Sequence, residues 1–336
     1  MAGIGNPYQH LMMQGLNEQG RLWAFNGAPS RFFGILQTGL FSKPNYLHFD
    51  WINSYYWRKT NWMTLLSVPA FVVQVLIVRY LLQIKIVWTV HNIVPHDAQM
   101  LWVHRSCQRF LAKNCDWIRV FSGDSLSRAA AELNVPIGTF RVVPEGSYVG
   151  FYEDTTTQTR ARQFLMLPPN ARILLYMGLV KPYKGVLELV QLFKKLNLPN
   201  TRLLIAGQAM DAGYQTKIES ELTDAVRFDN TFVAADALQH YFEAADVVVL
   251  PFKKIENSGS VIMAMGFRKA IVAPNLSVVK ERLSEQPQLL FDDAHTLEER
   301  IRQALALSSD ELLEIGNRNF DALKNHSWQD FAACFG

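Results

Sequence analysis

One short segment combines the residue types that bind a diphosphate. Residues 177–186 read MGLVKPYKGV and stand between a predicted strand and a predicted helix. Gly178 allows a tight turn off the strand, and a helix that begins near Gly185 offers N–H groups and a positive dipole end to an anion. Lys181 and Lys184 add full positive charges. The alternative is a solvated turn with incidental lysines, so this segment alone indicates a candidate anion site.

A second segment repeats the order of strand, loop and helix. Residues 250–260 read LPFKKIENSGS. Ser258, Gly259 and Ser260 stand where the first N–H groups of the next helix have no partner within the helix. Small residues there let a phosphate or a sugar hydroxyl approach, and Lys253 adds charge. An ordinary N-cap serine is the alternative, but two such segments together favour a diphosphate site.

A third segment offers groups for proton transfer. Residues 88–97 read WTVHNIVPHD and leave the carboxyl end of a predicted buried strand. His91, His96 and Asp97 on one loop suit acid–base chemistry, although a lone histidine is more often structural. No third ligand at helical spacing supports a metal site, so we expect none.

Two further loops are expected to line a ligand cleft. Residues 3–8 read GIGNPY before a predicted helix, and residues 143–150 read VPEGSYVG after a predicted strand. A capping loop and a plain turn are the alternatives. With the histidine loop, these segments supply the predicted acceptor or cleft residues Asn6, Tyr8, His91, Asn92, Glu145 and Tyr148.

Strands and helices alternate along the chain, and these elements must position the segments. Short apolar runs with helical patterns between them are typical of parallel strands buried on both faces. The pattern predicts a doubly wound α/β fold, in which ligands bind at the carboxyl ends of strands. Strands are predicted at residues 45–49, 85–90, 117–121, 140–143, 172–177, 202–206, 232–233, 247–250 and 270–273.

The length of 336 residues suits two domains of about 150 residues better than one core. The polar residues 152–163 look like a linker, after which the alternation restarts. We therefore predict a Rossmann-like domain over residues 1–160 and a second over residues 161–315, with the ligands in the cleft between them.

Composition excludes several classes of protein. A hydrophobic fraction of 49% and a charged fraction of 19% indicate a globular chain. The three cysteines match neither a zinc motif nor a disulfide framework. Residues 1–150 hold 13 Lys+Arg and 7 Asp+Glu, a net charge of +6, and residues 151–336 hold 20 and 23, a net charge of −3. The basic half suits an anionic membrane face, and we expect no nucleic-acid partner because no nucleic-acid motif accompanies it.

One apolar stretch bears on membrane contact. Residues 62–90 are long enough to span a bilayer, but Pro69, Gln74 and Arg79 interrupt them, so we predict a helix to about Leu82 and then a strand. Aromatic and basic residues at 51–62 suit the headgroup boundary. The sequence therefore predicts peripheral membrane contact through residues 51–82. The N-terminus is no secretory signal, so we expect a cytoplasmic protein, peripheral on the inner face of the membrane.

Together these segments resemble bacterial glycosyltransferases of the GT-B fold, near families 1 and 4, and more narrowly the xanthan β-mannosyltransferase-like enzymes of exopolysaccharide synthesis. The resemblance implies that the second domain binds a nucleotide sugar (GDP-mannose or UDP-hexose) and the first a saccharide or lipid-linked acceptor. It implies a C-terminal helix, residues 316–336, that crosses back to the first domain, and neither metal nor other cofactor. It is carried by NPYQHL at Asn6, YLHFDW at Tyr46, KIVWTVHNIVPHD at Lys85, GLVKPYKG at Gly178 and AADVVVLPFKKIENSGS at Ala244.

Two departures from the family bear on mechanism. Relatives tend to have an arginine where this chain has Leu179, and we expect Lys181 to replace it. Many retaining relatives carry two glutamates separated by seven residues in the region 251–266, whereas this chain has there only Glu256, out of register. We therefore expect inversion, which needs a base for the acceptor hydroxyl. The candidates, in falling order, are Asp97, His96 and Asp50.

Two other functions stay open from the sequence. One is an NDP-sugar epimerase with two domains, although the WTVHN loop and the lack of a matched acidic pair argue against it. The other is a non-catalytic, glycosyltransferase-like scaffold in polysaccharide assembly, which the missing glutamates favour.

Overall fold

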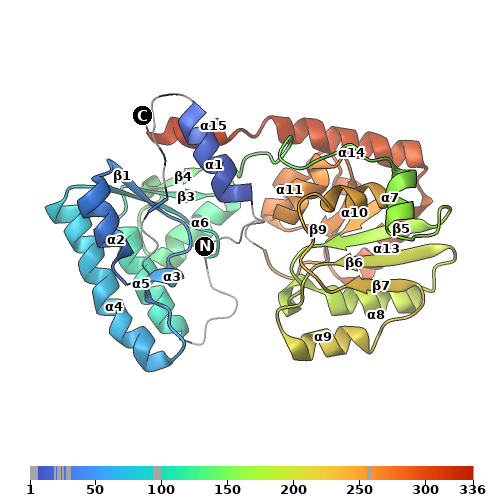
Figure 1. Cartoon of the computed structure of the whole chain (residues 1–336), viewed down its shortest axis with the longest axis horizontal. Coiled ribbons are helices and arrows are strands. Elements are labelled where there is room, and N and C mark those ends of the chain that lie inside the picture. The colour runs from blue at the N-terminus through green and yellow to red at the C-terminus, as the bar shows by residue number, and fades with distance from the viewer. Residues whose placement is uncertain are drawn as a thin grey trace. The chain divides into compact units, whose positions relative to one another are not determined.

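The chain forms two compact units, each built around its own parallel sheet (Figure 1). Unit 1 comprises Met1–Gly3, Met12–Glu145 and Gln329–Gly336, and unit 2 comprises Ile4–Leu11 and Gly146–Trp328. This architecture confirms the predicted α/β class. The computed structural model describes residues 7–18, 20, 24, 26–27, 32–93, 100–255 and 259–335.

The described part of unit 1 contains a parallel sheet in the order β1-β2-β3-β4. Consecutive strands lie side by side, and helices connect them. The strands are β1 (Tyr46–Phe49), β2 (Lys85–Thr89), β3 (Trp117–Val120) and β4 (Phe140–Val142). The helices are α1 (Pro7–Glu18), of which the residues up to Leu11 belong to unit 2, α2 (Gly34–Gln37), η1 (Thr38–Ser42), α3 (Asn53–Tyr56), α4 (Asn61–Leu76), η2 (Ile77–Leu81), α5 (Leu101–Asn114), α6 (Gly123–Leu133) and η3 (Ile137–Thr139).

Unit 2 has a larger parallel sheet in the order β10-β9-β8-β5-β6-β7. Its strands are β5 (Arg172–Met177), β6 (Thr201–Ala206), β7 (Val226–Asp229), β8 (Val247–Val249), β9 (Ala270–Pro274) and β10 (Leu290–Phe291). Its helices are α7 (Gln158–Phe164), η4 (Pro182–Lys184), α8 (Val186–Leu196), α9 (Ala212–Glu219), α10 (Leu238–Ala244), α11 (Gly259–Gly266), α12 (Ser277–Arg282), η5 (Pro287–Leu289), α13 (Ala294–Ala306) and α14 (Ser309–Lys324).

In each sheet, an aspartate that precedes one strand bonds to the backbone of the neighbouring strand and to an arginine. In unit 2, the Asp246 carboxylate accepts hydrogen bonds from Ile173 N at 2.7 Å and from the buried Arg162 guanidinium at 2.8 Å. In unit 1, the Asp116 carboxylate accepts one from Ile86 N at 2.8 Å and pairs with Arg79. These bonds satisfy polar groups at the amino edges of the sheets.

The C-terminal segment packs within unit 1, as predicted for a helix that returns to the first domain. It contains α15 (Trp328–Ala332) and η6 (Ala333–Phe335). Gln329 donates to a carboxylate oxygen of Glu18 in α1 at 3.3 Å. Phe331 and Phe335 pack edge-on against Trp117, with centroids 5.8 and 5.2 Å away.

Several predicted elements are wrong in detail. The strand expected at residues 232–233 is not formed. Phe232 is exposed, and the strand in this part of the chain is β7, which ends at Asp229. The stretch read as a linker contains α7, whose Arg162 makes the bond to Asp246. Tyr56, expected at the membrane surface, is buried and accepts or donates a hydrogen bond at 2.9 Å to His104 Nδ1.

Candidate functional site

The sheet of unit 2 has a topological switch point between β5 and β8. From β5 the chain continues to β6 and β7 on one side, and from β8 it continues to β9 and β10 on the other. Open α/β sheets bind their ligands at the carboxyl ends of the strands at such a point. The loops that leave β5 and β8 here are the two predicted diphosphate segments, and Lys253 N donates to Tyr183 O between them at 3.0 Å.

Glycines allow these loops to approach closely. A Cβ atom on Gly185 would lie 2.1 Å from Pro251 O, and its φ of +72° also disfavours a side chain. A Cβ atom on Gly178 would lie 2.8 Å from Ser260 Oγ, which places that hydroxyl against the start of the first loop. Gly207, after β6, is equally constrained, since its Cβ would lie 1.9 Å from Gly178 O. The backbone conformation around the predicted glycines is therefore tightly fixed.

Lys184 lies in this region at the end of η4 and is partly buried. Its Nζ lies over the ring of Phe252, 3.9 Å from the centroid. Burial, and then the charge of Lys181, lowers the pKa of Lys184 to about 8. No carboxylate among the described residues pairs with it or raises this pKa. A bound anion would supply the missing negative charge.

The other predicted donor residues have different surroundings. Lys253 pairs with Glu188 of α8, with 2.5 Å between Nζ and Oε1, so its charge is already balanced. Gly259 and Ser260 form the first turn of α11. Lys181 is half-buried beside Lys184. The structure thus singles out Lys184 among the lysines of these two loops.

In unit 1, Asp50 and His91 face each other at the carboxyl edge of the sheet. Phe49 and Trp88 are register partners on β1 and β2, so the residues that follow these strands meet. Asp50 Oδ1 lies 3.0 Å from His91 Nε2, and the His91 ring stacks on Trp51 with centroids 4.3 Å apart. An ionised carboxylate only accepts, so Nε2 is the donor in this pair. This is the geometry of an oriented general base.

His48, which the sequence analysis did not single out, lies beside this pair. It precedes Asp50 by two residues on an extended chain, which directs both side chains to one face of the sheet. Its Nε2 lies 2.7 Å from Thr89 Oγ1 and 3.8 Å from Asp50 Oδ1. Burial is the main cause that lowers the pKa of His48, against the opposing effect of Asp50. The period-two spacing in YLHFD was the available signal.

Comparison with known proteins agrees with this geometry. Residues 157–319 match the family model described as "Glycosyl transferases group 1". The matched residues, about half of the chain, lie within unit 2 and are similar to the group 1 glycosyltransferases. A GDP-mannose:glycolipid 4-beta-D-mannosyltransferase from Xanthomonas campestris pv. campestris is similar to this chain, with 27% identity over 246 residues. The match covers 73% of this chain and 65% of the relative, so the chain spans less than two thirds of that relative's length.

Solved structures confirm the GT-B fold of this chain. A sucrose-phosphate synthase from Thermosynechococcus elongatus has a TM-score of 0.69 at 19% identity, and the match covers 95% of this chain and 80% of the other. HepE from Anabaena, in complex with UDP, has a TM-score of 0.71 at 15% identity, over 96% of this chain and 87% of the other. At these identities the structures show the fold alone.

Some of the remaining predicted residues are described by the structure, and the others are not. Tyr8 and Tyr148 are buried and pack on Trp328, with ring centroids 5.3 and 6.4 Å away. Both rings therefore have a structural role in packing. Glu145 is buried, and the carbonyl of the exposed Asn92 accepts a hydrogen bond from Gln108 at 3.4 Å. Outside the described residues lie Asn6, His96, Asp97 and Ser258.

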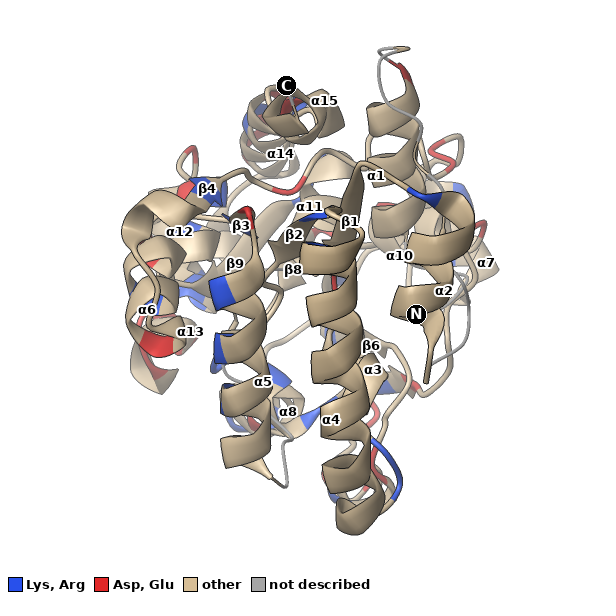
Figure 2. Cartoon of the chain, turned by 90° about the vertical axis from the view of Figure 1, so that its left-hand side faces the viewer, with Lys and Arg blue, Asp and Glu red and all other residues tan. Residues whose placement is uncertain are grey.

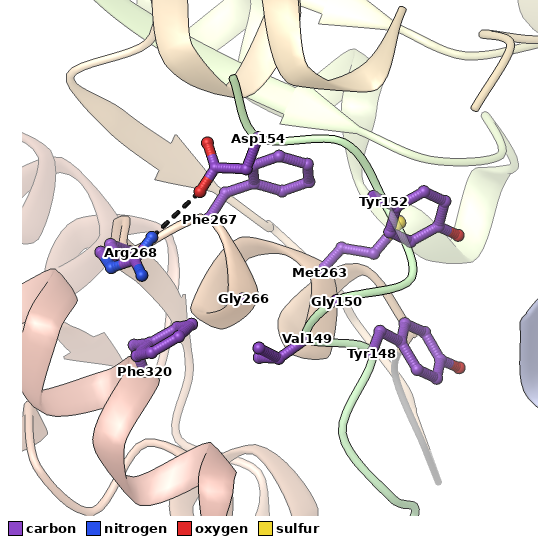
Figure 3. Close-up of a pocket in the computed structure, with 10 residues that line it drawn as sticks. All are labelled: Tyr148, Val149, Gly150, Tyr152, Asp154, Met263, Gly266, Phe267, Arg268 and Phe320. Carbon is purple, nitrogen blue, oxygen red and sulfur yellow. Dashed lines mark hydrogen bonds and ion pairs between the residues drawn. The ribbon is translucent and has the colours of Figure 1, made fainter. Parts of the chain in front are cut away.

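A small pocket lies at the C-terminal end of α11 (Figure 3). Figure 3 shows Arg268 paired with Asp154, at 3.0 Å, beside the ring of Phe320. The cavity volume is about 80 Å³, well below the roughly 300–1,000 Å³ of ligand sites, so it does not fit a nucleotide sugar. The described residues contain no cluster of three or more His, Cys, Asp or Glu that could hold a metal ion.

Proposed function

We propose that this glycosyltransferase transfers a hexose from GDP-mannose or UDP-hexose to a lipid-linked or growing polysaccharide acceptor, with inversion at the anomeric carbon. The family match supports sugar transfer. The printed name of the Xanthomonas relative combines GDP-mannose, a glycolipid and a β-linkage, and HepE was crystallised with UDP. With a lipid-linked acceptor, the chain would act at the cytoplasmic face of a membrane.

The observation that carries this proposal is the state of Lys184. Its pKa is lowered to about 8 because it is partly buried and faces another lysine. Negative charge grows on the diphosphate as the bond to the sugar breaks, and a fixed cation in a site poor in water stabilises that charge strongly. Lys184 would lie against the diphosphate, with Lys181 and the first turn of α11, including Ser260, as further partners.

Inversion requires one base for the acceptor hydroxyl. Asp97 and His96 stay candidates, and among the described residues the Asp50–His91 pair has the required geometry, with 3.0 Å between Oδ1 and Nε2. Asp50 would hold His91, and His91 Nδ1 would take the proton. The absence of a glutamate pair in residues 251–266 favours this route over retention.

Lys184→Ala tests the donor site directly. We expect UDP and GDP to raise the unfolding temperature of the wild type, since ligands that bind the folded state stabilise it, and not that of Lys184→Ala. Lys217→Ala removes an exposed lysine of unit 2 and serves as the control. Equal UDP and GDP affinity in wild type and Lys184→Ala would exclude Lys184 as a diphosphate ligand.

The stereochemistry is tested separately by NMR of the product. An α-linked donor that yields a β-linked product supports inversion, and an α-linked product contradicts it. Donor binding without transfer to any acceptor in a panel would instead favour the scaffold function.

A further inference from the structure

The outer side of the helix formed by α4 and η2 is apolar along its whole length. Surface helices of globular proteins ordinarily carry polar residues there. Here one row of exposed residues recurs every three or four positions, and none is charged. The row comprises Trp62, Leu66, Pro69, Val73, Leu76 and Tyr80. Met63, Leu65 and Leu81 are exposed beside it. Figure 2 faces this helix and shows α4 without a Lys, Arg, Asp or Glu.

A second apolar segment lies beside it in unit 1. The buried Gln74 of α4 donates to Phe32 O at 2.6 Å and accepts from Leu36 N at 3.3 Å. Gly39 packs closely on the same helix, since a Cβ atom there would lie 3.1 Å from Val78 Cγ2. The chain around α2 and η1 is therefore fixed along α4, and Phe41 is 84% exposed. The two segments form one apolar surface, which we name the α2–α4 face.

The sequence that contains this face is basic, and Arg79 of η2 pairs with Asp116. Residues 19–96 contain seven Lys or Arg and one acidic residue, Asp50. Asp50 bonds to His91 at the carboxyl edge of the sheet. Lys43 and Lys85 line a cavity of about 520 Å³ at the opposite, amino edge, together with Leu40 and Leu82 of the apolar elements. Lys85 Nζ contacts the Tyr46 hydroxyl at 3.4 Å, and neither lysine pairs with a carboxylate in the described part of the chain.

We infer that the α2–α4 face binds the surface of an anionic lipid bilayer, with its apolar side chains at the acyl boundary and Lys43 and Lys85 on lipid phosphates. Apolar side chains on one face of a helix and cations at its rim are the features of interfacial helices. The inference deepens the proposed lipid-linked acceptor by naming the surface that reaches the membrane. Donor binding in unit 2 does not depend on it.

The helix lies along the bilayer and does not span it. Asn61–Leu81 has 21 residues and a mean hydropathy of 1.8, enough for a span by length and composition. Its inner side, however, belongs to the core of unit 1, where Phe71, Val75 and Val78 are fully buried. A helix that spanned the bilayer would have to remove these side chains from the core, whereas a helix that lies along the surface keeps them buried. Of the aromatic residues first expected at the membrane, Tyr56 is fully buried, whereas Trp62 is exposed and belongs to this face.

Flotation of the full chain with vesicles tests the inference. We expect binding to vesicles of phosphatidylcholine mixed with phosphatidylglycerol, weaker binding to phosphatidylcholine alone, and release by salt. Leu66→Glu and Leu81→Glu change side chains that are 69% and 79% exposed, so they should fold normally and reduce binding to both vesicles at least tenfold. Leu313→Glu, at an exposed position of unit 2, is the matched control.

The lysines are tested by a second pair of variants. Lys43→Gln/Lys85→Gln should weaken binding to the anionic vesicles by about fivefold per lysine and leave phosphatidylcholine binding unchanged. Lys217→Gln/Lys280→Gln, with the same net charge, should bind like the wild type. Stabilisation by UDP or GDP is measured on every variant, so that loss of the donor site is recognised separately.

Four results with vesicles or cells, and a fifth with inorganic phosphate, would overturn the inference. The first four are no binding to anionic vesicles, equal binding by Leu66→Glu, dimerisation that Leu66→Glu abolishes, and retention in cell membranes at alkaline pH. The third would assign the face to a second copy of the chain and the fourth to a spanning helix. Stabilisation by inorganic phosphate that depends on Lys43, without vesicle binding, would assign the cavity to a free anion and would also refute it.

Discussion

Replacing Lys184 with methionine tests whether the charged lysine lowers the free energy of unfolding. Its pKa falls from 10.5 to about 8 because burial, and then Lys181, disfavour the charged form. A fall of that size corresponds to about 3 kcal/mol against the ammonium in the folded state. Contact with the Phe252 ring, 3.9 Å away, offsets part of this. Methionine has a similar length and also packs on aromatic rings, so Lys184→Met should raise the unfolding free energy at pH 7 by about 1–3 kcal/mol.

The pH dependence of this difference carries a definite sign. Because the pKa of Lys184 is lower in the folded state, the unfolded wild type binds more protons between about pH 8 and 10.5. Wild-type stability therefore rises relative to Lys184→Met as the pH increases through that window. The advantage of the variant is complete below about pH 8 and is lost as the pH rises to about 10.5.

Urea unfolding of both proteins at neutral and alkaline pH measures the effect. Lys217→Met removes an exposed lysine of the same unit and should show neither the stabilisation nor its pH dependence. The reasoning is refuted by a Lys184→Met protein that is less stable than wild type at pH 7. A difference that stays constant from about pH 7 to 10 would refute it equally.

Three further changes test the site and the fold. Gly185→Ala puts a Cβ atom 2.1 Å from Pro251 O at a φ of +72°, and urea unfolding should show a loss of about 2–4 kcal/mol, whereas Gly213→Ala, which meets only an ordinary contact at 3.4 Å, should change little. Asp50→Asn keeps the shape of the side chain but weakens its hydrogen bond to His91, so the transfer rate should fall by about 10²–10⁴-fold at unchanged donor KM. A higher donor KM with an unchanged transfer rate would contradict a role in proton transfer. Arg162→Leu leaves the Asp246 carboxylate, 8% exposed, with the Arg172 guanidinium 3.6 Å away in place of the closer one. Urea unfolding should show a loss of up to about 3–5 kcal/mol in the unfolding free energy, while a neutral result would mean that Arg172 or water replaces the Arg162 guanidinium.

The donor loops could be predicted from the sequence because each is a local pattern. An apolar run, a glycine and a lysine before an amphipathic run specify strand, turn and helix start within ten residues, as at Gly178 and Lys184. The switch point that brings two such loops together depends on strand order, which no single segment encodes. Gly207 was missed for this reason, since its role depends on the approach of Gly178 from the neighbouring strand.

Contacts between residues on neighbouring strands could not be predicted from local sequence patterns. Asp50 and His91 are 41 residues apart, and they meet only because β1 and β2 are neighbours in the register that aligns Phe49 with Trp88. Residues 62–82 were correctly predicted to be helical, but an all-apolar helix does not reveal which side the sheet covers. That side is set by Phe71 and Val75 against the core, and the exposed stripe then follows.

Lys184 and the α2–α4 face share a physical trait, which is that folding alone gives no reason for either. A partly buried ammonium disfavoured by about 3 kcal/mol takes a large share of the 5–15 kcal/mol that typically stabilises a domain. The exposed stripe from Trp62 to Tyr80 leaves apolar area in water that polar residues would cover at no loss of packing. Local rules fail in proteins mainly where function requires it. An anion at Lys184 and a lipid surface on the α2–α4 face would each remove the corresponding cost, so ligand and membrane should both stabilise the chain, independently of each other.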